Sequence, residues 1–332
     1  MPMPDARAQT YLRTETMLKT AMGPAVVEAL DDPAIVEVMV NPDGKIWIDA
    51  HGDGRMETGA VMPAAEAERV IRVVGSHIGQ EVDRLHPIVS AELPGGGERF
   101  EGVIPPVTTA PCFSIRKPAA RVFTLDDYVE TGVTSAEDAD ALKAAVRDAM
   151  NILIVGGTGS GKTTLANALL AEVAMSGDRV VILEDTRELQ CEAKDKVNLR
   201  TQAGAVAMAD LVRSTLRLRP DRIIVGEVRG GEALDMLKAW NTGHPGGIAT
   251  IHANSAGGGL QRLEQLVSEV TAQTPHALIA EAIDLIVFIA GRGPERRVRT
   301  ISRVLGREAG DYRLEPFSSP LSQIVKLKGS SS

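Results

Sequence analysis

The sequence predicts an α/β fold in two domains. Its 332 residues exceed the roughly 250–300 residues at which a single hydrophobic core stops growing, so two cores are expected. In the second part of the chain, short β-branched runs alternate with segments of helical periodicity, which is typical of a mostly parallel sheet with crossover helices. The first part mixes helices and strands in another order, which indicates an α+β domain.

The first domain is expected over residues 1–130. The Asn41–Gly44 segment has the composition of a turn between two strands. Apolar spacing predicts helices over 11–30 and 64–78, strands over 35–40 and 45–49, and extended runs over 100–104 and 112–116. The boundary is expected within 124–137, where Asp, Glu, Thr and Gly cluster.

The second domain is expected over residues 131–318. β-Branched runs predict strands at 152–155, 180–183, 223–225, 248–251 and 285–289, and helical spacing predicts helices at 208–218, 232–240 and 260–270. An antiparallel hairpin is expected from Arg297–Val304 and Tyr312–Pro316, around a glycine-containing turn. Residues 319–332 form a polar tail that we expect to lie outside the fold.

Composition and charge narrow the class of protein. Hydrophobic residues make up 44% and charged residues 24% of the chain, which is ordinary for a globular protein. The acidic surplus lies wholly in residues 1–134, with 12 Lys and Arg against 20 Asp and Glu, whereas residues 135–332 balance at 24 against 24. With aromatic residues at only 3%, this charge distribution disfavours direct nucleic-acid binding, which needs cations and stacking surfaces.

The sequence predicts a cytoplasmic protein. Charged residues interrupt the N-terminal segment as they do not in a signal peptide. No run reaches the ~18 apolar residues of a membrane span. The two cysteines, Cys112 and Cys191, are too few for a disulfide framework or a four-cysteine zinc site.

A glycine-rich segment directly follows the first predicted strand of the second domain. It fits the pattern G-x-x-x-x-G-K-[ST] of a phosphate-binding P-loop, with a strand before it and a helix-forming segment after it, so a plain Gly/Ser turn is disfavoured. Lys162 is expected to reach the β- and γ-phosphates, and the Thr163 hydroxyl to bind Mg²⁺. The sequence thus predicts an ATP and Mg²⁺ site whose phosphate-binding residues are Gly156, Gly157, Thr158, Gly159, Ser160, Gly161, Lys162, Thr163 and Thr164.

Acidic residues follow two further strands. Glu184 and Glu188 come after the second strand, where a carboxylate can activate water or cap a turn. Glu227 ends the third strand and fits a variant of the Walker B motif, in which it would share Mg²⁺ with Thr163. The alternative is a buried structural carboxylate. At the end of the fourth strand, His252 can hydrogen-bond the γ-phosphate and sense its presence.

Four motifs in this order resemble the traffic ATPases of secretion and conjugation, in the VirB/Trb branch of type IV secretion. They are the P-loop, an acidic box, the Walker B segment and a histidine box, at Gly156–Thr164, Glu184–Leu189, Val225–Gly230 and Thr242–Asn254. The resemblance runs from about Ile35 to Tyr312. It implies a RecA-like ATPase domain behind a smaller, PAS-like domain. It further implies a homohexamer at the cytoplasmic face of the inner membrane, with peripheral membrane contact and other secretion components as partners.

The resemblance also implies roles for single residues. Glu188 would activate water, with Glu184 in reserve, and Glu227 would assist at Mg²⁺ or water. Arg116 would approach the γ-phosphate from the first domain. Charge-neutralising arginines would be Arg217 and Arg229, on their own or a neighbouring subunit's nucleotide, and carboxylate pairing is the alternative for both.

The implied function is an ATP-hydrolysing motor for pilus assembly or substrate transfer in a type IV secretion or conjugation machine. A nucleotide-gated scaffold with negligible turnover is the first alternative, and the acidic residues of the site speak against it. A type II secretion or pilus ATPase of the same superfamily is the second. Those relatives often carry a four-cysteine zinc module, which two cysteines cannot build.

Overall fold

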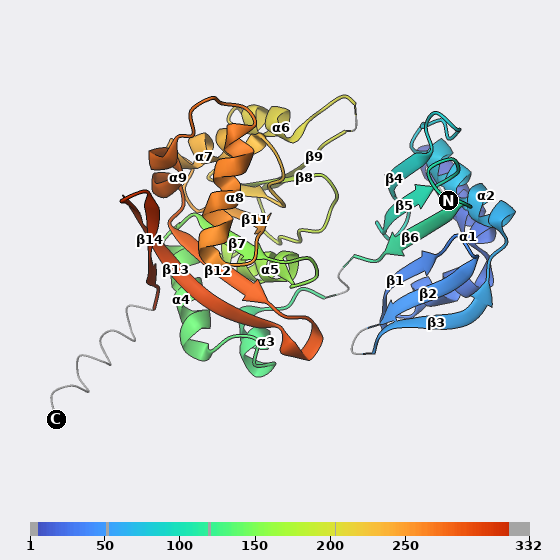
Figure 1. Ribbon diagram of the computed structural model, residues 1–332, viewed down its shortest axis with the longest axis horizontal. Coiled ribbons are helices and arrows are strands. Elements are labelled where there is room, and N and C mark those ends of the chain that lie inside the picture. The colour runs from blue at the N-terminus through green and yellow to red at the C-terminus, as the bar shows by residue number, and fades with distance from the viewer. Residues whose placement is uncertain (1–5, 51–52, 119–120, 203, 319–332) are drawn as a thin grey trace. The chain divides into compact units, whose positions relative to one another are not determined.

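The chain folds into two compact units, Met1–Ala120 and Arg121–Ser332. This computed structural model describes residues 6–50, 53–118, 121–202 and 204–318, with side chains from residue 13 onward. We describe each unit by itself (Figure 1). No helix of the described residues is long and apolar enough to cross a membrane.

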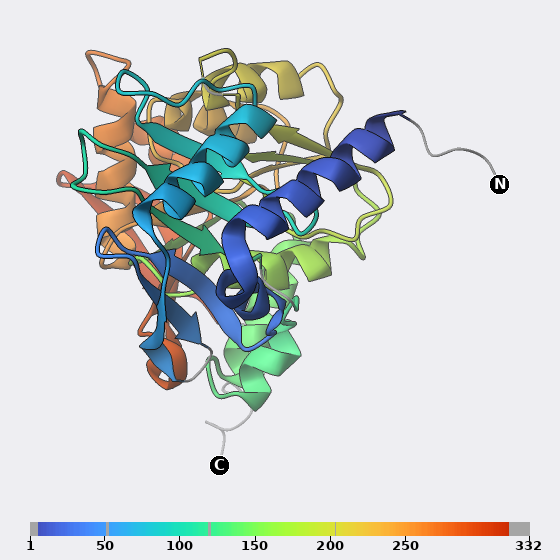
Figure 2. The ribbon, with the colours of Figure 1, turned by 90° about the vertical axis from the view of Figure 1, so that its right-hand side faces the viewer.

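The first unit is an antiparallel sheet with two helices on one face, as Figure 2 shows. The strand order is β3-β2-β1-β6-β5-β4. The strands are β1 (Ile35–Val40), β2 (Lys45–Ala50), β3 (Gly54–Val61), β4 (Ile88–Glu92), β5 (Arg99–Val103) and β6 (Cys112–Arg116), and the helices are α1 (Ala6–Asp31) and α2 (Ala64–His77). Their apolar faces form one core, which includes Met22, Val38, Ile71, Phe100 and Ile115.

The helix expected over 11–30 contains a break. Gly23 takes φ 73° and ψ 170° inside α1, directly before Pro24. A left-handed φ is accessible to glycine at little cost, and proline supplies no N–H for the helix ladder, so the helix kinks at this pair. The predicted hairpin of β1 and β2 and the predicted helix α2 are confirmed.

The second unit is an eight-stranded sheet between two layers of helices. Its strand order is β14-β13-β12-β7-β11-β10-β8-β9. The six strands β12, β7, β11, β10, β8 and β9 are parallel, and β13 and β14 add an antiparallel pair at the β12 edge. The strands are β7 (Ile152–Gly156), β8 (Val180–Glu184), β9 (Lys196–Arg200), β10 (Arg222–Val225), β11 (Ile248–His252), β12 (Leu285–Ala290), β13 (Arg297–Glu308) and β14 (Asp311–Pro316).

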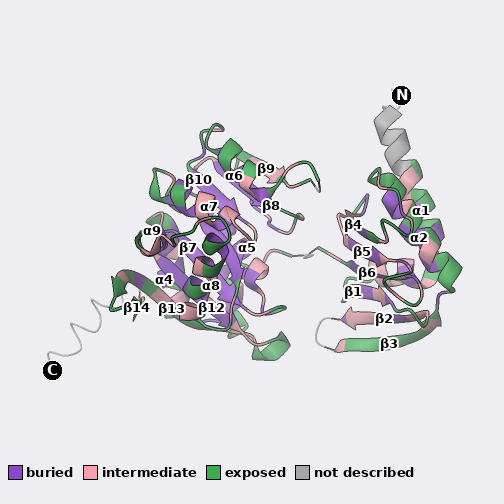
Figure 3. Cartoon of the chain, turned by 45° about the horizontal axis from the view of Figure 1, so that its top comes forward, coloured by how far each residue is buried: buried purple, intermediate pink, exposed green. Residues whose placement is uncertain are grey.

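One helical layer covers each face of this sheet. α3 (Leu125–Glu130), α4 (Ala136–Arg147) and α5 (Lys162–Val173) share a core with one face. The other core holds α6 (Met208–Thr215), α7 (Glu232–Asn241), α8 (Ala256–Ser268) and α9 (His276–Ala282). The central strands are therefore buried on both sides, as Figure 3 shows, which explains their unbroken apolar runs.

The boundary between the units lies earlier than the expected 130/131 division. The chain divides after Ala120, and α3 belongs to the second unit because Leu125 and Tyr128 are buried in its core. All five predicted parallel strands and the edge hairpin are confirmed. The predicted tail at 319–332 lies outside the described residues.

Candidate active site

The predicted P-loop has the geometry of a strand, a tight loop and a helix. β7 is fully buried up to Gly156, and α5 begins at Lys162. Gly159 and Gly161 take φ values of 74° and 95°, a region that favours glycine. A Cβ on Gly156 would lie 2.5 Å from both Ile289 O and Ser160 Oγ, so no larger residue fits there.

The ends of neighbouring strands bring the predicted residues together. His252 at the end of β11 pairs with Gly156 of β7, and β10 runs parallel to both β11 and β8. Glu227 follows β10 and Glu184 ends β8 at this same edge of the sheet. The carboxyl edge of a parallel sheet is where ligands bind in open α/β folds.

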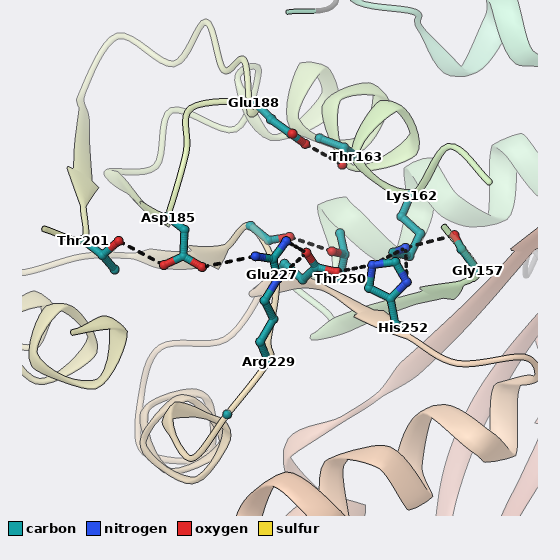
Figure 4. Close-up of polar contacts among 12 residues, drawn as sticks. Gly157, Lys162, Thr163, Asp185, Glu188, Thr201, Glu227, Arg229, Thr250 and His252 are labelled. Atoms are coloured by element: carbon teal, nitrogen blue, oxygen red, sulfur yellow. Dashed lines mark hydrogen bonds and ion pairs between the residues drawn. The ribbon is translucent and has the colours of Figure 1, made fainter. Parts of the chain in front are cut away.

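Lys162 lies at the centre of this edge, in contact with His252 (Figure 4). Its Nζ donates to Gly157 O at 3.1 Å and lies 3.2 Å from Nδ1 of His252. Nε2 of the same ring lies 3.3 Å from Nζ of Lys162 and 2.6 Å from Oε1 of Glu227. This arrangement suits a neutral imidazole with its proton on Nε2, so that Nδ1 accepts from the ammonium.

The electrostatics of His252 favour the same neutral form. Burial and the Lys162 ammonium lower the pKa of His252, and the nearby Glu227 carboxylate raises it by less. At neutral pH the imidazole is therefore uncharged. An uncharged ring can hydrogen-bond a phosphate without adding a second charge beside Lys162.

A chain of ion pairs extends from Glu227 across the sheet edge. Arg229 Nε donates to Oε2 of Glu227 at 2.7 Å, and a guanidinium nitrogen lies 3.8 Å from Asp185 Oδ2. Asp185 in turn accepts from the Thr201 hydroxyl at 3.0 Å (Figure 4). In this structure Arg229 therefore pairs with carboxylates, which is the alternative role considered for it.

The Glu188 carboxylate lies at the start of α5. The Thr163 hydroxyl donates to its Oε2 at 3.1 Å. Asn167, also on α5, donates to the Glu188 carbonyl at 3.1 Å and accepts from Gln190 N–H at 2.8 Å. This helix therefore fixes the segment that carries Glu188 beside the P-loop.

Glu184 is buried and caps a turn. Its Oε1 accepts the backbone N–H groups of Glu188 at 2.9 Å and Leu189 at 2.8 Å. A Cβ on Gly226 would lie 3.0 Å from Glu184 Cγ, so the glycine makes room for this side chain. Burial raises the pKa of Glu184 to about 7, against the lowering effect of the two N–H donors.

The residues present fit ATP and Mg²⁺. The Ser160 hydroxyl of the P-loop is buried without a hydrogen-bond partner, which marks a polar atom that a ligand can satisfy. No group of three or more His, Cys, Asp or Glu in the described part of the chain could hold a metal by itself. Mg²⁺ at a phosphate chain needs only one or two protein ligands, and Thr163 and Glu227 can supply them.

Two further predicted arginines are exposed on their own units. Arg116 ends β6 in the first unit and is exposed there. Arg217 follows α6 and is exposed. The other histidine of the histidine box, His244, has its Nδ1 3.0 Å from Pro220 O, and this contact joins two loops.

Three residues at this site were not predicted from the sequence. Asp185 belongs to the acidic box but was given no role, although it directly follows β8. Arg292 and Arg296 follow β12, the strand beside β7, and both lie against the P-loop. The rule that ligands bind at strand ends would have singled out Arg292, two residues after the strand.

Comparison with known proteins identifies the class to which this site belongs. Residues 20–292 match the family described as type II/IV secretion system protein, and the chain belongs to that family. The family inferred from the four motifs is thereby confirmed.

Three relatives illustrate the match. The chain is 50% identical over 312 residues, 93% of this chain and 96% of the relative, to the conjugal transfer protein TrbB of Rhizobium radiobacter. It is 36% identical over 303 residues, 80% of this chain and 88% of the relative, to the type IV secretion system protein PtlH of Bordetella pertussis. The crystal structure of the pilus retraction motor PilT with bound ADP matches in fold, with a TM-score of 0.59 and 16% identity over 94% of this chain and 87% of that one.

Proposed function

We propose that the protein is an ATP-hydrolysing motor of a type IV secretion or conjugal transfer machine, with a RecA-like second unit and a PAS-like first unit. The observation that carries this proposal is the meeting of Lys162, His252, Glu227 and the Thr163–Glu188 pair at one sheet edge. Half of the aligned residues are shared with a conjugal transfer protein over nearly its whole length. A near full-length match of this kind supports a shared role.

The P-loop would bind the phosphates of ATP. Backbone N–H groups from Gly157 through Thr164 would face the phosphate oxygens, and Lys162 would exchange its contacts with Gly157 O and His252 for the β- and γ-phosphates. Thr163 and Glu227 would hold Mg²⁺ there, which neutralises charge on the phosphates and fixes their geometry.

Glu188 is the better placed of the two carboxylates to activate water. Its Oε2 lies at the Thr163 hydroxyl, beside the phosphate cradle. Glu184 is buried, and its Oε1 accepts hydrogen bonds from two backbone N–H groups. Its role would be to stabilise the turn that carries Glu188. His252 would contact the γ-phosphate and, through Nε2, report its presence to Glu227.

Arginines would complete the site from elsewhere. Arg229 is paired with Glu227 and Asp185. It can exchange these carboxylates for a nucleotide phosphate, bound either in the same subunit or in a neighbouring one. Arg217 is exposed and suits the same role across a subunit boundary. Arg116 would approach the γ-phosphate from the first unit. An arginine that enters a phosphoryl-transfer site late supplies about 10³ to 10⁵ in rate.

We further propose the assembly and location that go with this role. The working form would be a homohexamer, peripheral on the cytoplasmic side of the inner membrane, where it contacts other secretion components. The relative's function in conjugal transfer favours this assignment over a type II secretion or pilus ATPase. The carboxylates at the phosphate cradle favour a hydrolytic motor over a scaffold that only binds nucleotide.

Substitution of the P-loop lysine tests the proposal. We expect Lys162→Ala to abolish phosphate release by the purified full-length chain in Mg²⁺-ATP, because the phosphates lose their principal cation. Lys238→Ala is the matched control, since it removes an exposed lysine on α7. A Lys162→Ala protein that hydrolyses ATP at the wild-type rate would overturn the assignment.

A further inference from the structure

Two arginines lie against the P-loop on the side of β12. They belong to the loop Gly291–Arg296, which joins β12 to β13. Arg292 Nη2 donates to the carbonyl oxygen of Thr158 at 3.1 Å. The Nε of the same side chain lies 3.4 Å from the position that a Cβ on Gly159 would take, so the guanidinium packs on the glycine backbone.

Arg296 packs on the last glycine of the P-loop. A Cβ on Gly161 would lie 2.8 Å from Arg296 Nε, closer than real Cβ atoms approach. The loop that carries both arginines is itself fixed, since Arg296 N–H donates to Gly293 O at 3.2 Å and Glu295 N–H to Arg292 O at 3.0 Å. Both side chains are therefore held beside the P-loop by backbone structure.

The surroundings of this loop contain polar atoms that lack partners. Among the described residues, the buried side-chain atoms without a hydrogen bond include Ser160 Oγ, Arg296 Nε and Tyr128 OH. Ser160 is 4% and Tyr128 3% exposed, so both side chains are buried away from bulk solvent. Ser160 belongs to the P-loop itself, so its unpaired hydroxyl is an atom that a ligand bound at this loop can satisfy.

The charge at this place points to an anion. Within the described part of the chain, neither Arg292 nor Arg296 forms an ion pair with a carboxylate, and Lys162 emerges from the same loop. The hydrogen bond to Thr158 O uses one of the five N–H donors of the Arg292 guanidinium. Guanidinium groups with donors to spare bind phosphate oxygens in a bidentate fashion.

We propose that Arg292 is a further nucleotide-binding residue, which contacts the phosphate chain of a nucleoside triphosphate across the P-loop, while Arg296 positions Gly161. This inference rests on the proposed function, because it needs a nucleotide in the P-loop. Arg292 would be a second cation at the phosphates besides Lys162. It comes from the loop after β12, on the side of the P-loop away from His252. The P-loop is thereby held between two strand ends, β11 and β12, which both neighbour β7.

The test is equilibrium binding of ATP and of inorganic tripolyphosphate to the full-length chain in Mg²⁺. We expect Arg292→Gln to weaken both ligands about tenfold, which is the effect of losing one charge-assisted hydrogen bond. Because tripolyphosphate lacks a base and a ribose, an equal loss for both ligands assigns the contact to phosphate. Arg292→Lys keeps a cation and is expected to recover most of the affinity.

The matched control is Arg299→Gln, which removes an exposed arginine from β13 of the same segment. It is expected to bind both ligands as the wild type does, and all variants are expected to keep the wild-type melting temperature. If Arg292→Gln binds both ligands within twofold of the wild type, this inference is wrong and the proposed function stands. A wild-type chain that binds neither ligand would overturn the proposed function and this inference together.

Discussion

At the scale of single residues, the acidic box contains two carboxylates, each of which could either activate water or cap a turn. Glu184 and Glu188 stand four residues apart in one acidic box, and the sequence left both open as water activators. The structure separates them, because only Glu184 is buried and capping, with Oε1 on two N–H groups. Burial and turn geometry depend on the packing of β8 against its neighbours, which the local sequence does not contain.

The burial of Glu184 predicts a pH dependence of stability. Its pKa is raised from the ordinary value to about 7. Between about pH 4.5 and 7 the unfolded chain therefore releases a proton that the folded chain retains, so the free energy of unfolding falls as pH rises, by on the order of 3 kcal/mol. Below this window both states are protonated, and above it both are ionised.

Glu184→Gln isolates this effect. The amide oxygen can still accept both N–H groups but does not titrate, so the variant should lack this fall between pH 4.5 and 7. Urea unfolding of both proteins across pH 4.5–8 measures the difference, with the exposed Glu192→Gln as a control for loss of a charge. A difference between wild type and Glu184→Gln that is constant with pH would contradict this account of the carboxylate.

At the scale of elements, the buried strands were predictable and the exposed ones were not. The strands β7, β8, β10, β11 and β12 are buried on both faces, so each is an unbroken apolar run. The strands β3, β4 and β9 were not predicted, because all three lie at sheet edges and have mostly exposed or half-buried side chains. Their polar sequences are compatible with strands only because a neighbouring strand supplies the hydrogen bonds.

Besides the Thr163–Glu188 contact, the Asn167 side chain of α5 couples the P-loop helix to the acidic box. Asn167 is 2% exposed and bonds both Glu188 O and Gln190 N–H. We expect Asn167→Ala to lower the free energy of unfolding by about 1–3 kcal/mol, because buried partners lose their hydrogen bonds. It should also lower ATP turnover, because the Glu188 segment then keeps its Thr163 contact but loses two hydrogen bonds to the helix.

Urea unfolding and steady-state phosphate release measure these two effects. Asn198→Ala, at an exposed position on β9, is the matched control and should change neither quantity. Unchanged stability in Asn167→Ala would show that the two hydrogen bonds do not hold the acidic box to α5.

At the scale of the whole molecule, the two units predicted from chain length are present, and their boundary at Ala120 was displaced in the prediction. The stretch 124–137 looked like a linker because its Asp, Thr and Ser residues cap helices. Thr124 and Ser135 are the N-caps of α3 and α4. Polar caps and polar linkers share a composition, so burial of Leu125 and Tyr128 is what distinguishes them.

The strand-end residues of the site were largely predictable for a topological reason. In a parallel sheet with crossover helices, strand ends meet at one edge whatever the order of the strands. Lys162, Glu227 and His252 could thus be assigned to one place from sequence alone. The same rule assigns Arg292, two residues after β12, to this edge, but its contact with the P-loop also requires that β12 lies beside β7, which no local sequence pattern shows.

The central claim is that this sheet edge hydrolyses ATP and does not merely bind it. Glu188→Gln tests that claim most directly, because the amide cannot take a proton from water yet leaves the P-loop unchanged. The measurement is ATP binding and phosphate release by the full-length chain in Mg²⁺, for wild type and Glu188→Gln side by side. We expect equal ATP binding and a loss of phosphate release of about 10² to 10⁴ in the variant. Phosphate release by Glu188→Gln at the wild-type rate, or release at background by the wild type itself, would contradict the account.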